Sequence, residues 1–543
     1  MYKRQLQWNW ANTLTYHHQF NEIHTVDVIL GSEAVSSESE IIRASRTHYF
    51  SDDIDYMTLD TGTDNILNSG NGIKTNTFSI FARVDYDLLG KYVVQATIRR
   101  DGSSNFGPNM RYGTFPAISA GWRISKEGFM SSSNNWLNYL KLRAAIGETG
   151  NDRISNLNAY TLYTSHIERG FYPLDGNSTN TMPGFDSYTL GNPNAKWETT
   201  TTTDIGLDAK LWEGLSITAD YWLRNTSDML FPVQLPATWG RVNVLPSINI
   251  GNMQNKGFDI SVGYNKSGSG NFRYGATINI SHYKNKIVKL SNNEDEFIQG
   301  ANGQNYNYTR TEVGHSFPEF YGYIVDGIFQ TQAEADAHTP FGVYNKPGHY
   351  IYRNVNPDDL IDDKDRTYIG SPHPDFTGGI NLNIGYKNLE LSAFLYGSYG
   401  NDVVNYVNRW IDYKCFGGNR SKDRLYKSWG SPHLANNIDA ILPIAELNDS
   451  KSQLPSTAFI EDASYLRLKT LQLSYNLPSK WLNKLQMKGV KLYVQGNNLF
   501  TITKYSGLDP EIGGRGSKGM KMGLDAGAWP TAKQIMFGVD INF

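Results

Sequence analysis

A two-residue alternation of apolar and polar side chains is the feature that most restricts the fold of this chain. Successive side chains of a β-strand point to opposite faces, so such alternation gives one apolar and one polar face. A helix with about 3.6 residues per turn would scatter both sets around its circumference. The clearest case is residues 203–211, where Ile205, Leu207, Ala209 and Leu211 alternate with Asp204, Gly206, Asp208 and Lys210.

The same alternation recurs along the whole chain. We expect about 15 strands, many of them near the ~10 residues with which a strand crosses a membrane. Between Leu468 and Leu471 the apolar set changes phase, which predicts a β-bulge. The expected strands are 6–16, 26–30, 78–86, 92–98, 116–124, 140–146, 203–211, 215–224, 258–265, 272–280, 380–386, 389–395, 466–475, 490–494 and 535–543.

Short and long connections alternate between these strands. Short turns on one side and long loops on the other are typical of bacterial outer-membrane barrels, and strand-end aromatics fit the interface girdles of such barrels. A soluble β-sandwich remains the alternative, with more uniform spacing expected. The short turns are 88–91, 212–214, 265–271 and 387–388, and the long loops are 36–75, 149–195, 227–254, 291–374, 401–462 and 504–531.

Composition excludes several other classes. The 50 Lys and Arg against 53 Asp and Glu give a net charge of −3, which offers nucleic acid no attraction. Mean hydropathy is −0.48, and no run of about 18 apolar residues predicts a membrane helix. The single cysteine, Cys415, excludes a disulfide framework. No nucleophile elbow, phosphate-binding loop or zinc-binding helix motif occurs, so we expect no enzyme.

Several segments along the chain carry recognisable motifs. The longest is GKYVVQATIRRDGSSNFGPNMRYGTFPAISAGWRISKEGFM at 90–130. Others are LKLRAAIGETGND (140–152), NPNAKWETTTTTDIGLD (192–208), EFYGYIVDGIFQT (319–331), NNLFTITKYSGLDPE (497–511) and the terminal FGVDINF (537–543). In family order, these segments resemble the SusC/RagA-type TonB-linked outer-membrane transporters of Bacteroidetes, and the matches span nearly the whole chain.

The resemblance implies an all-β, transmembrane antiparallel barrel with long extracellular loops in the bacterial outer membrane. Family barrels resemble plugged transporters of about 22 strands, so residues 1–543 are expected to be a partial barrel domain, its C-terminal ~15 strands. No signal peptide, TonB box or plug is recognised in this sequence.

The function that the resemblance implies is nutrient import. Oligosaccharide or peptide would be taken up with a SusD-like lipoprotein as lid, and the TonB–ExbB–ExbD system would act on the plug. Outer-membrane lipid is a further expected partner. The alternatives are a non-transporting receptor or scaffold that docks surface lipoproteins, and a passive porin.

An acidic stretch in the longest loop, NVNPDDLIDDKD at 354–365, is similar to a calcium loop that the family often carries here. Carboxylate and amide oxygens suit Ca²⁺, which is the only cofactor the sequence suggests. Position 6, where such loops place glycine, is Asp359. A solvated acidic loop is the alternative reading. The candidate ligands are Asn354, Asn356, Asp358, Asp362 and Asp365.

Aromatic residues gather in the expected outer loops. Flat rings beside Asn and Asp would suit contact with a sugar, a peptide or a lid protein, and packing of one loop on another is the alternative. Lumen-facing arginines such as Arg99 and Arg143 are expected to pair with aspartates such as Asp204. The candidate substrate or lid contacts are Phe320, Tyr321, Tyr323, Trp410, Tyr413, Trp429 and Trp529.

Overall fold

The computed structural model describes residues 2–133, 135–165, 170–177, 181–232, 246–266, 271–290, 298–303, 306–413, 418–447, 449–482, 487–512 and 519–542. The chain divides into two compact units. Unit 1 comprises Met1–Phe129, Lys141–Ile205 and Arg224–Asn252, and unit 2 comprises Met130–Leu140, Gly206–Leu223 and Met253–Phe543. No helix in the described part is long and apolar enough to cross a membrane. Cys415 and Phe543 lie outside the described residues.

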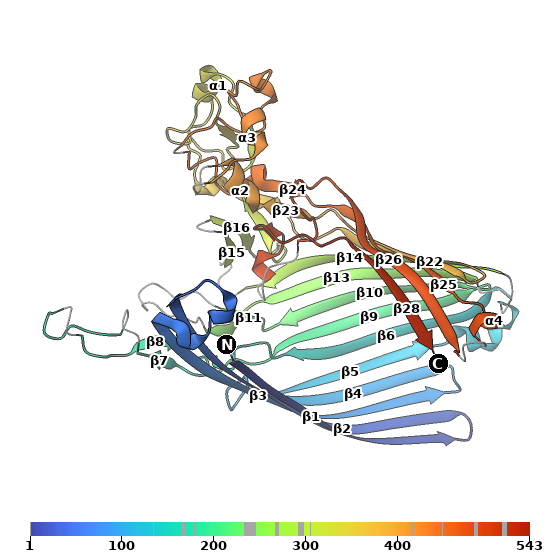
Figure 1. The fold of residues 1–543 in the computed structure, drawn as a ribbon. Coiled ribbons are helices and arrows are strands. Elements are labelled where there is room, and N and C mark those ends of the chain that lie inside the picture. Colours follow the sequence, from blue (N-terminus) through green and yellow to red (C-terminus); the bar gives the residue numbers. More distant parts are fainter. Residues whose placement is uncertain are drawn as a thin grey trace. The chain divides into compact units, whose positions relative to one another are not determined.

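Fifteen strands form one large antiparallel sheet, which confirms the expected strand number (Figure 1). Its order follows the chain, β1-β2-β3-β4-β5-β6-β9-β10-β13-β14-β21-β22-β25-β26-β28, so each strand lies beside the next long one. The bounds are β1 Tyr2–Phe20, β2 His24–Tyr49, β3 Gly62–Leu88, β4 Tyr92–Ser103, β5 Tyr112–Trp122, β6 Leu137–Asn151, β9 Glu198–Leu211, β10 Leu215–Ser227, β13 Asn252–Lys266, β14 Phe272–Lys289, β21 Phe376–Tyr386, β22 Leu389–Tyr399, β25 Tyr465–Asn476, β26 Gly489–Thr503 and β28 Gln534–Asn542.

Shorter elements lie in the connections. The strands are β7 Leu162–Thr164, β8 Asp186–Thr189, β11 Leu230–Pro232, β12 Ser247–Asn249, β15 Ile298–Gly303, β16 Tyr306–Thr311, β17 Glu319–Gly322, β18 Val325–Ile328, β19 Tyr350–Tyr352, β20 Thr367–Gly370, β23 Asp402–Asn405, β24 Ile460–Asp462 and β27 Leu524–Asp525. The α-helices are α1 Gln332–Ala337, α2 Tyr406–Asp412, α3 Lys422–Tyr426 and α4 Ser479–Leu482.

In unit 1 the two faces of a strand differ in exposure as the alternation predicts. Along β4, Tyr92, Val94 and Ile98 are exposed large apolar residues, whereas Gln95 and Arg99 on the other face are half-buried. The turn from β3 to β4 places Leu89 and Gly90 at φ 59° and 64°. Glycine takes such positive angles without a steric cost, which favours a tight turn here. Strand β4 therefore presents an exposed, largely apolar face and a half-buried polar face.

The sequence predicted a long loop at 36–75, and this prediction is wrong. Strands β2 and β3 continue through most of it and pair as far as Tyr49 and Gly62. The sequence SSESE at 36–40 is polar on both faces, so it lacks the alternation that signals a half-buried strand. Only residues 50–61 connect the two strands, and they hold the short 3-10 turns η1 Ile54–Tyr56 and η2 Leu59–Thr61.

In unit 2 the predicted bulge is present. The register of β25 shifts against β22 between Phe394 and Leu395, and against β26 between Leu468 and Thr470. One extra residue in β25 moves the following apolar set to the other phase, which keeps Leu471 and Leu473 on the apolar face. The sequence therefore located both the strand and its irregularity.

Candidate functional site

Three connections of unit 2 fold together into a body that we call the loop assembly. It consists of the described residues of the connections β14–β21, β22–β25 and β26–β28. All three lie at one end of their strands, because the shorter connections β21–β22 and β25–β26 lie at the other. The loop assembly contains two small sheets, β15-β16-β17-β20 and β24-β23-β27, and the strand pair β18-β19.

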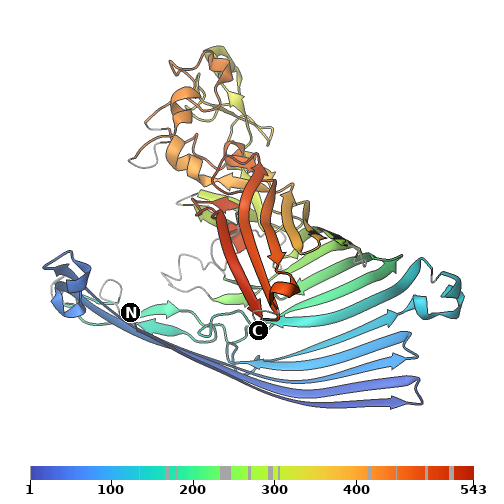
Figure 2. The same cartoon turned by 45° about the vertical axis from the view of Figure 1, so that its right-hand side comes forward.

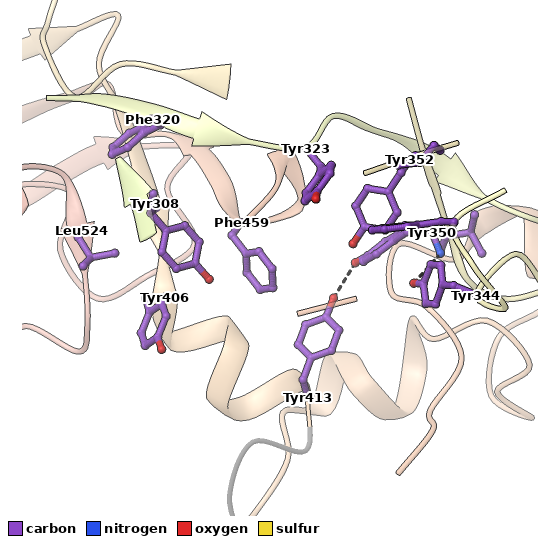
Figure 3. Packing of buried hydrophobic residues seen from close by; sticks show 14 residues of the cluster. Tyr308, Phe320, Tyr323, Tyr344, Tyr350, Tyr352, Tyr406, Tyr413, Phe459 and Leu524 are labelled. Atoms are coloured by element: carbon purple, nitrogen blue, oxygen red, sulfur yellow. Dashed lines mark hydrogen bonds between the residues drawn. The ribbon is translucent and has the colours of Figure 1, made fainter. Parts of the chain in front are cut away.

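The core of the loop assembly is aromatic (Figure 3). Several of its ring pairs meet edge to face, an arrangement that the charge distribution of aromatic rings favours. Tyr308 and Tyr406 stand with ring centroids 5.5 Å apart at 89°. Phe341 and Tyr352 stand 5.4 Å apart at 86°. The buried members are Tyr308, Phe320, Tyr323, Ile328, Phe341, Tyr344, Tyr350, Tyr352, Ile361, Val404, Tyr406, Tyr413, Phe459 and Leu524.

Several tyrosine hydroxyls in this core have hydrogen-bond partners, which removes much of the cost of burying them. The hydroxyls of Tyr350 and Tyr413 are 2.7 Å apart and come from two different connections. Tyr352 donates to the carbonyl oxygen of Lys451 at 2.7 Å. Burial raises the pKa of Tyr350 to about 12, and it also raises that of Tyr344. Burial therefore strengthens the preference of these hydroxyls for the neutral form, in which they can donate hydrogen bonds.

Three of the sequence-predicted contact residues lie inside this core. Phe320, Tyr323 and Tyr413 expose 0%, 4% and 4% of their surface. Trp410 and Trp429 are partly buried and pack against the core. Phe320, Tyr323 and Tyr413 therefore present almost no surface to a ligand. Their burial agrees with the packing of one loop on another, which the sequence left open as an alternative.

The remaining two predicted contacts are placed differently. Tyr321 is half-buried, with the guanidinium carbons of Arg310 and Arg366 at 4.7 and 5.1 Å from its ring centroid. Arg310 also donates to its hydroxyl at 2.9 Å. Such cation–π contacts hold neighbouring segments together. Trp529 is 93% exposed, so its ring is the one large aromatic surface in the predicted set that is fully available to a ligand.

A buried ion pair joins the loop assembly to the sheet, and the sequence did not signal it. Arg467 of β25 is 3% exposed and donates to Asp509 at 2.5 Å and to Glu511 at 2.8 Å. Burial alone raises the pKa of Asp509, but hydrogen bonds from Arg467 and Thr531 outweigh it and lower the pKa to about 2. The carboxylate is therefore ionised whenever the pair is intact.

The acidic stretch at 354–365 is held by its own carboxylate. Asp365 is fully buried and accepts the backbone amides of Val355, Asn356 and Asp362 at 2.8, 3.0 and 2.8 Å. Asp358 accepts the side-chain amide of Asn356 at 2.7 Å. Within the residues that the structure describes, no group of three or more His, Cys, Asp or Glu is placed to hold a metal ion. Asp365 thus organises this loop, and a bound cation stays a prediction.

A cavity of about 530 Å³ opens within the loop assembly, beside Tyr350 and Ile328. Four carboxylates line it, those of Asp326, Asp412, Asp423 and Glu461, with one Lys427. Each carboxylate has a protein donor. Glu461, for example, accepts the amide of Asn405 at 2.9 Å and the Ser506 hydroxyl at 2.8 Å. The cavity is polar and anionic, and its charges are already satisfied by the protein.

The polar face of unit 1 carries the expected ion pairs. Arg143 meets Asp204 at 3.3 Å, as predicted. Arg99 pairs with Asp101 at 2.6 Å and Glu33 at 3.2 Å, partners that the sequence did not identify. Charged pairs on the face opposite the apolar one fit the polar interior of a membrane barrel.

These features define the wall of a membrane β-barrel with a folded loop assembly at one end of its strands. A family model described as TonB dependent receptor-like, beta-barrel, matches residues 2–499. The chain therefore belongs to the TonB-dependent receptor β-barrel family, and its strands are part of a bacterial outer-membrane barrel.

Named relatives agree with the predicted resemblance. TonB-dependent receptor P3 of Formosa agariphila is 31% identical over 540 residues, which is 98% of this chain and 52% of the relative. TonB-dependent receptor SusC of Bacteroides thetaiotaomicron is 30% identical over 477 residues, which is 86% of this chain and 43% of the relative. This chain thus spans about half the length of the curated relatives it matches.

A solved structure of the RagAB peptide transporter is similar over the whole described fold. Its TM-score is 0.81 at 26% sequence identity, and the match covers 100% of this chain and 56% of that one. The resemblance to SusC/RagA-type transporters is therefore confirmed.

Proposed function

We propose that the chain supplies barrel wall and outer loop assembly to a SusC-like importer that takes up oligosaccharides or peptides across the outer membrane. The observation that carries the proposal is the loop assembly, because binding residues lie disproportionately on loops that a rigid scaffold positions. The family match and the similarity to SusC and to the RagAB peptide transporter support it. A surface lipoprotein like SusD would form the lid, and TonB would drive import.

The remaining wall would come from other strands. In the described sheet, β1 and β28 each have a single neighbour, so each presents an unpaired edge. Unpaired backbone groups in lipid cost several kcal/mol each, so a barrel must close. We propose that these 15 strands are the C-terminal part of a barrel of about 22, whose plug lies in the half that this chain does not span.

Within this proposal, Trp529 and the accessible side of Tyr321 are the aromatic contacts for substrate or lid. Both belong to the loop assembly, and Trp529 exposes nearly its entire ring. Alanine at either position should weaken uptake, whereas alanine at the half-exposed Trp122 of β5 should not.

The test is growth and uptake after deletion of the gene. Cells without the protein should fail to grow on one class of oligosaccharide or peptide and should not accumulate its labelled form. TonB depletion should abolish the same uptake. Normal growth on every nutrient tested would contradict import and favour the alternative, a receptor or scaffold that docks surface lipoproteins.

A further inference from the structure

Five neighbouring strands of unit 2 share a row of aligned residues on their apolar face. The strands are β14, β21, β22, β25 and β26, which lie side by side in the sheet (Figure 2, from green to red). The two inner positions of the row are glycines, so the face lacks side chains between its isoleucine in β14 and its leucine in β25. From β14 to β26 the row consists of Ile280, Gly378, Gly397, Leu466 and Ile502.

Large side chains close this gap along the strands. On the side of the loop assembly, Phe376 is aligned with Tyr399, and on the other side Ile380 is aligned with Leu395. The result is a hollow of about 760 Å³, a size within the range of about 300–1,000 Å³ that ligand sites have. We call this hollow, whose floor is the two glycines, the glycine slot.

The glycine slot lies on the lipid side of the barrel wall. Ile280, Leu466 and Ile502 around it expose 43%, 40% and 62% of their surface, as side chains that face lipid do. Small residues on such a face let another apolar group approach the backbone closely, and van der Waals packing then drives association. An empty hollow would forfeit those contacts. The slot therefore calls for an apolar occupant from the bilayer.

The shape of the slot favours a lipid acyl chain over a second barrel. Its floor is two strands wide, and neighbouring strands lie only about 5 Å apart. Tyr399, at its edge, exposes 66% of its surface. A second copy of this chain would present a pleated sheet, which is too broad to enter so narrow a hollow. A single flexible hydrocarbon chain can enter it.

The rim of the slot on the side of the loop assembly is polar. It includes Lys504, Asp462 and Ser464, and Lys504 is exposed. Asp462 brings a negative charge to the same rim, but its carboxylate accepts the backbone amide of Ser464 at 2.9 Å. Basic side chains at the edge of a membrane attract anionic head groups. Lys504 is thus the donor that this rim offers to a phosphate.

We propose that the glycine slot holds one acyl chain of a phosphate-bearing lipid and that Lys504 binds the head-group phosphate of this lipid. Long loops mark the extracellular end of barrel strands, so the lipid belongs to the outer leaflet. The inference rests on the membrane barrel alone and does not depend on which solute is imported.

The experiment measures lipid binding to the full-length transporter in detergent by native mass spectrometry. The probes are palmitoyl-oleoyl-phosphatidylglycerol and palmitoyl-oleoyl-glycerol, which has the same chains without the phosphate. Leu395→Trp fills the slot from its wall, because a Cβ at Gly378 would lie 2.8 Å from the carbonyl oxygen of Asn279 and would strain the strand. The matched control, Leu391→Trp, lies on the same face of β22 but does not line the hollow. Lys504→Gln removes the charge at the rim.

Leu395→Trp should raise the Kd of both probes by about tenfold or more, because each buried methylene contributes to lipid binding. Lys504→Gln should raise the Kd of the phosphatidylglycerol alone, by about fivefold. Leu391→Trp should bind both probes like the native protein. All variants should keep the native melting temperature, and Leu466→Trp fills the slot from the opposite wall if Leu395→Trp melts early.

Several results would overturn the proposal without touching the proposed import, which uptake measures separately. Equal Kd values for the native protein, Leu395→Trp and Leu391→Trp would show that the slot holds no acyl chain, and so would a native protein that binds neither probe. Conversion of a dimer into a monomer by Leu395→Trp, with unchanged Kd, would mean that a second copy covers the slot. An unchanged Kd for Lys504→Gln would contradict the phosphate contact.

Discussion

In unit 2, the long strands expose large apolar residues, whereas the loop assembly buries them. In β28, Ile535 and Phe537 expose 68% and 82% of their surface, whereas Phe320 and Tyr352 of the loop assembly expose 0% and 2%. The strands have lipid as their apolar solvent, so their apolar side chains point outward. The loop assembly stands in water and has to bury its own rings. The comparison teaches that exposure reports the solvent around a segment as much as its packing.

The largest effect should follow from emptying the loop core. Phe320→Ala removes a fully buried ring and should destabilise the loop assembly by about 3–5 kcal/mol. Thermal unfolding and protease resistance of the purified protein measure this loss. Trp529→Ala, in the same assembly but 93% exposed, is the matched control and should change stability by less than about 0.5 kcal/mol. Equal effects would mean that the loop assembly has no packed core.

The next largest effect should follow from breaking the buried ion pair that joins the strands to the loop assembly. Arg467→Met leaves the buried Asp509 without its strongest donor and should cost about 3 kcal/mol, because a buried charge then lacks its partner. The control is Arg353→Met, which breaks an exposed pair with Asp326 and should cost less than about 1 kcal/mol. Urea denaturation compares them. If Arg467→Met loses no more stability than Arg353→Met, the ion pair between Arg467 and Asp509 does not stabilise the contact between the loop assembly and the sheet.

A charge on the lipid face should act through the membrane. Ile380→Lys, near the middle of β21, should destabilise the barrel by about 2–3 kcal/mol, because lipid solvates lysine poorly. Asn381→Lys, one residue further and on the opposite face, should be tolerated within about 1 kcal/mol. Folding into lipid vesicles at graded urea concentrations separates the two. The reverse order would mean that the faces are assigned the wrong way round.

Acid should weaken the ion pair between Arg467 and Asp509 in a defined pH range. Because the folded pKa of Asp509 is lowered to about 2, its stabilising contribution is complete above the unfolded pKa of about 4. It is lost as pH falls from about 4 to about 2, by roughly 2 kcal/mol. Stability measured against pH should therefore fall less steeply in Asp509→Asn than in the native protein. Parallel curves through this window would contradict the lowered pKa.

The strands could be predicted because their two faces meet different environments, which produces a two-residue period in the sequence. Lipid on one face and water on the other forces alternation residue by residue, as in 203–211, and even the bulge near Lys469 shifts that period visibly. The extension of β2 and β3 was missed since residues 36–40 are polar on both faces. Alternation signals a strand only where its two faces meet different solvents.

The loop assembly could be predicted only in part. The sequence identified its aromatic residues, but which rings are buried depends on contacts between distant connections. Tyr350 and Tyr413 are 63 residues apart, and Arg467 and Asp509 are 42 apart. No local period relates such pairs. A cluster such as YIY at 350–352 is the nearest signal, since three large β-formers in a Gly- and Asn-rich loop suggest a buried strand.

The most direct test of the account is the side of the membrane on which each region lies. In a Cys415→Ser background, Trp529→Cys and Leu89→Cys place single thiols in the loop assembly and in the β3–β4 turn, both at exposed positions. A membrane-impermeant thiol reagent should label Trp529→Cys in intact cells and Leu89→Cys only after the outer membrane is permeabilised. Labelling of Leu89→Cys in intact cells, or of neither thiol until permeabilisation, would contradict a barrel whose loop assembly faces the outside.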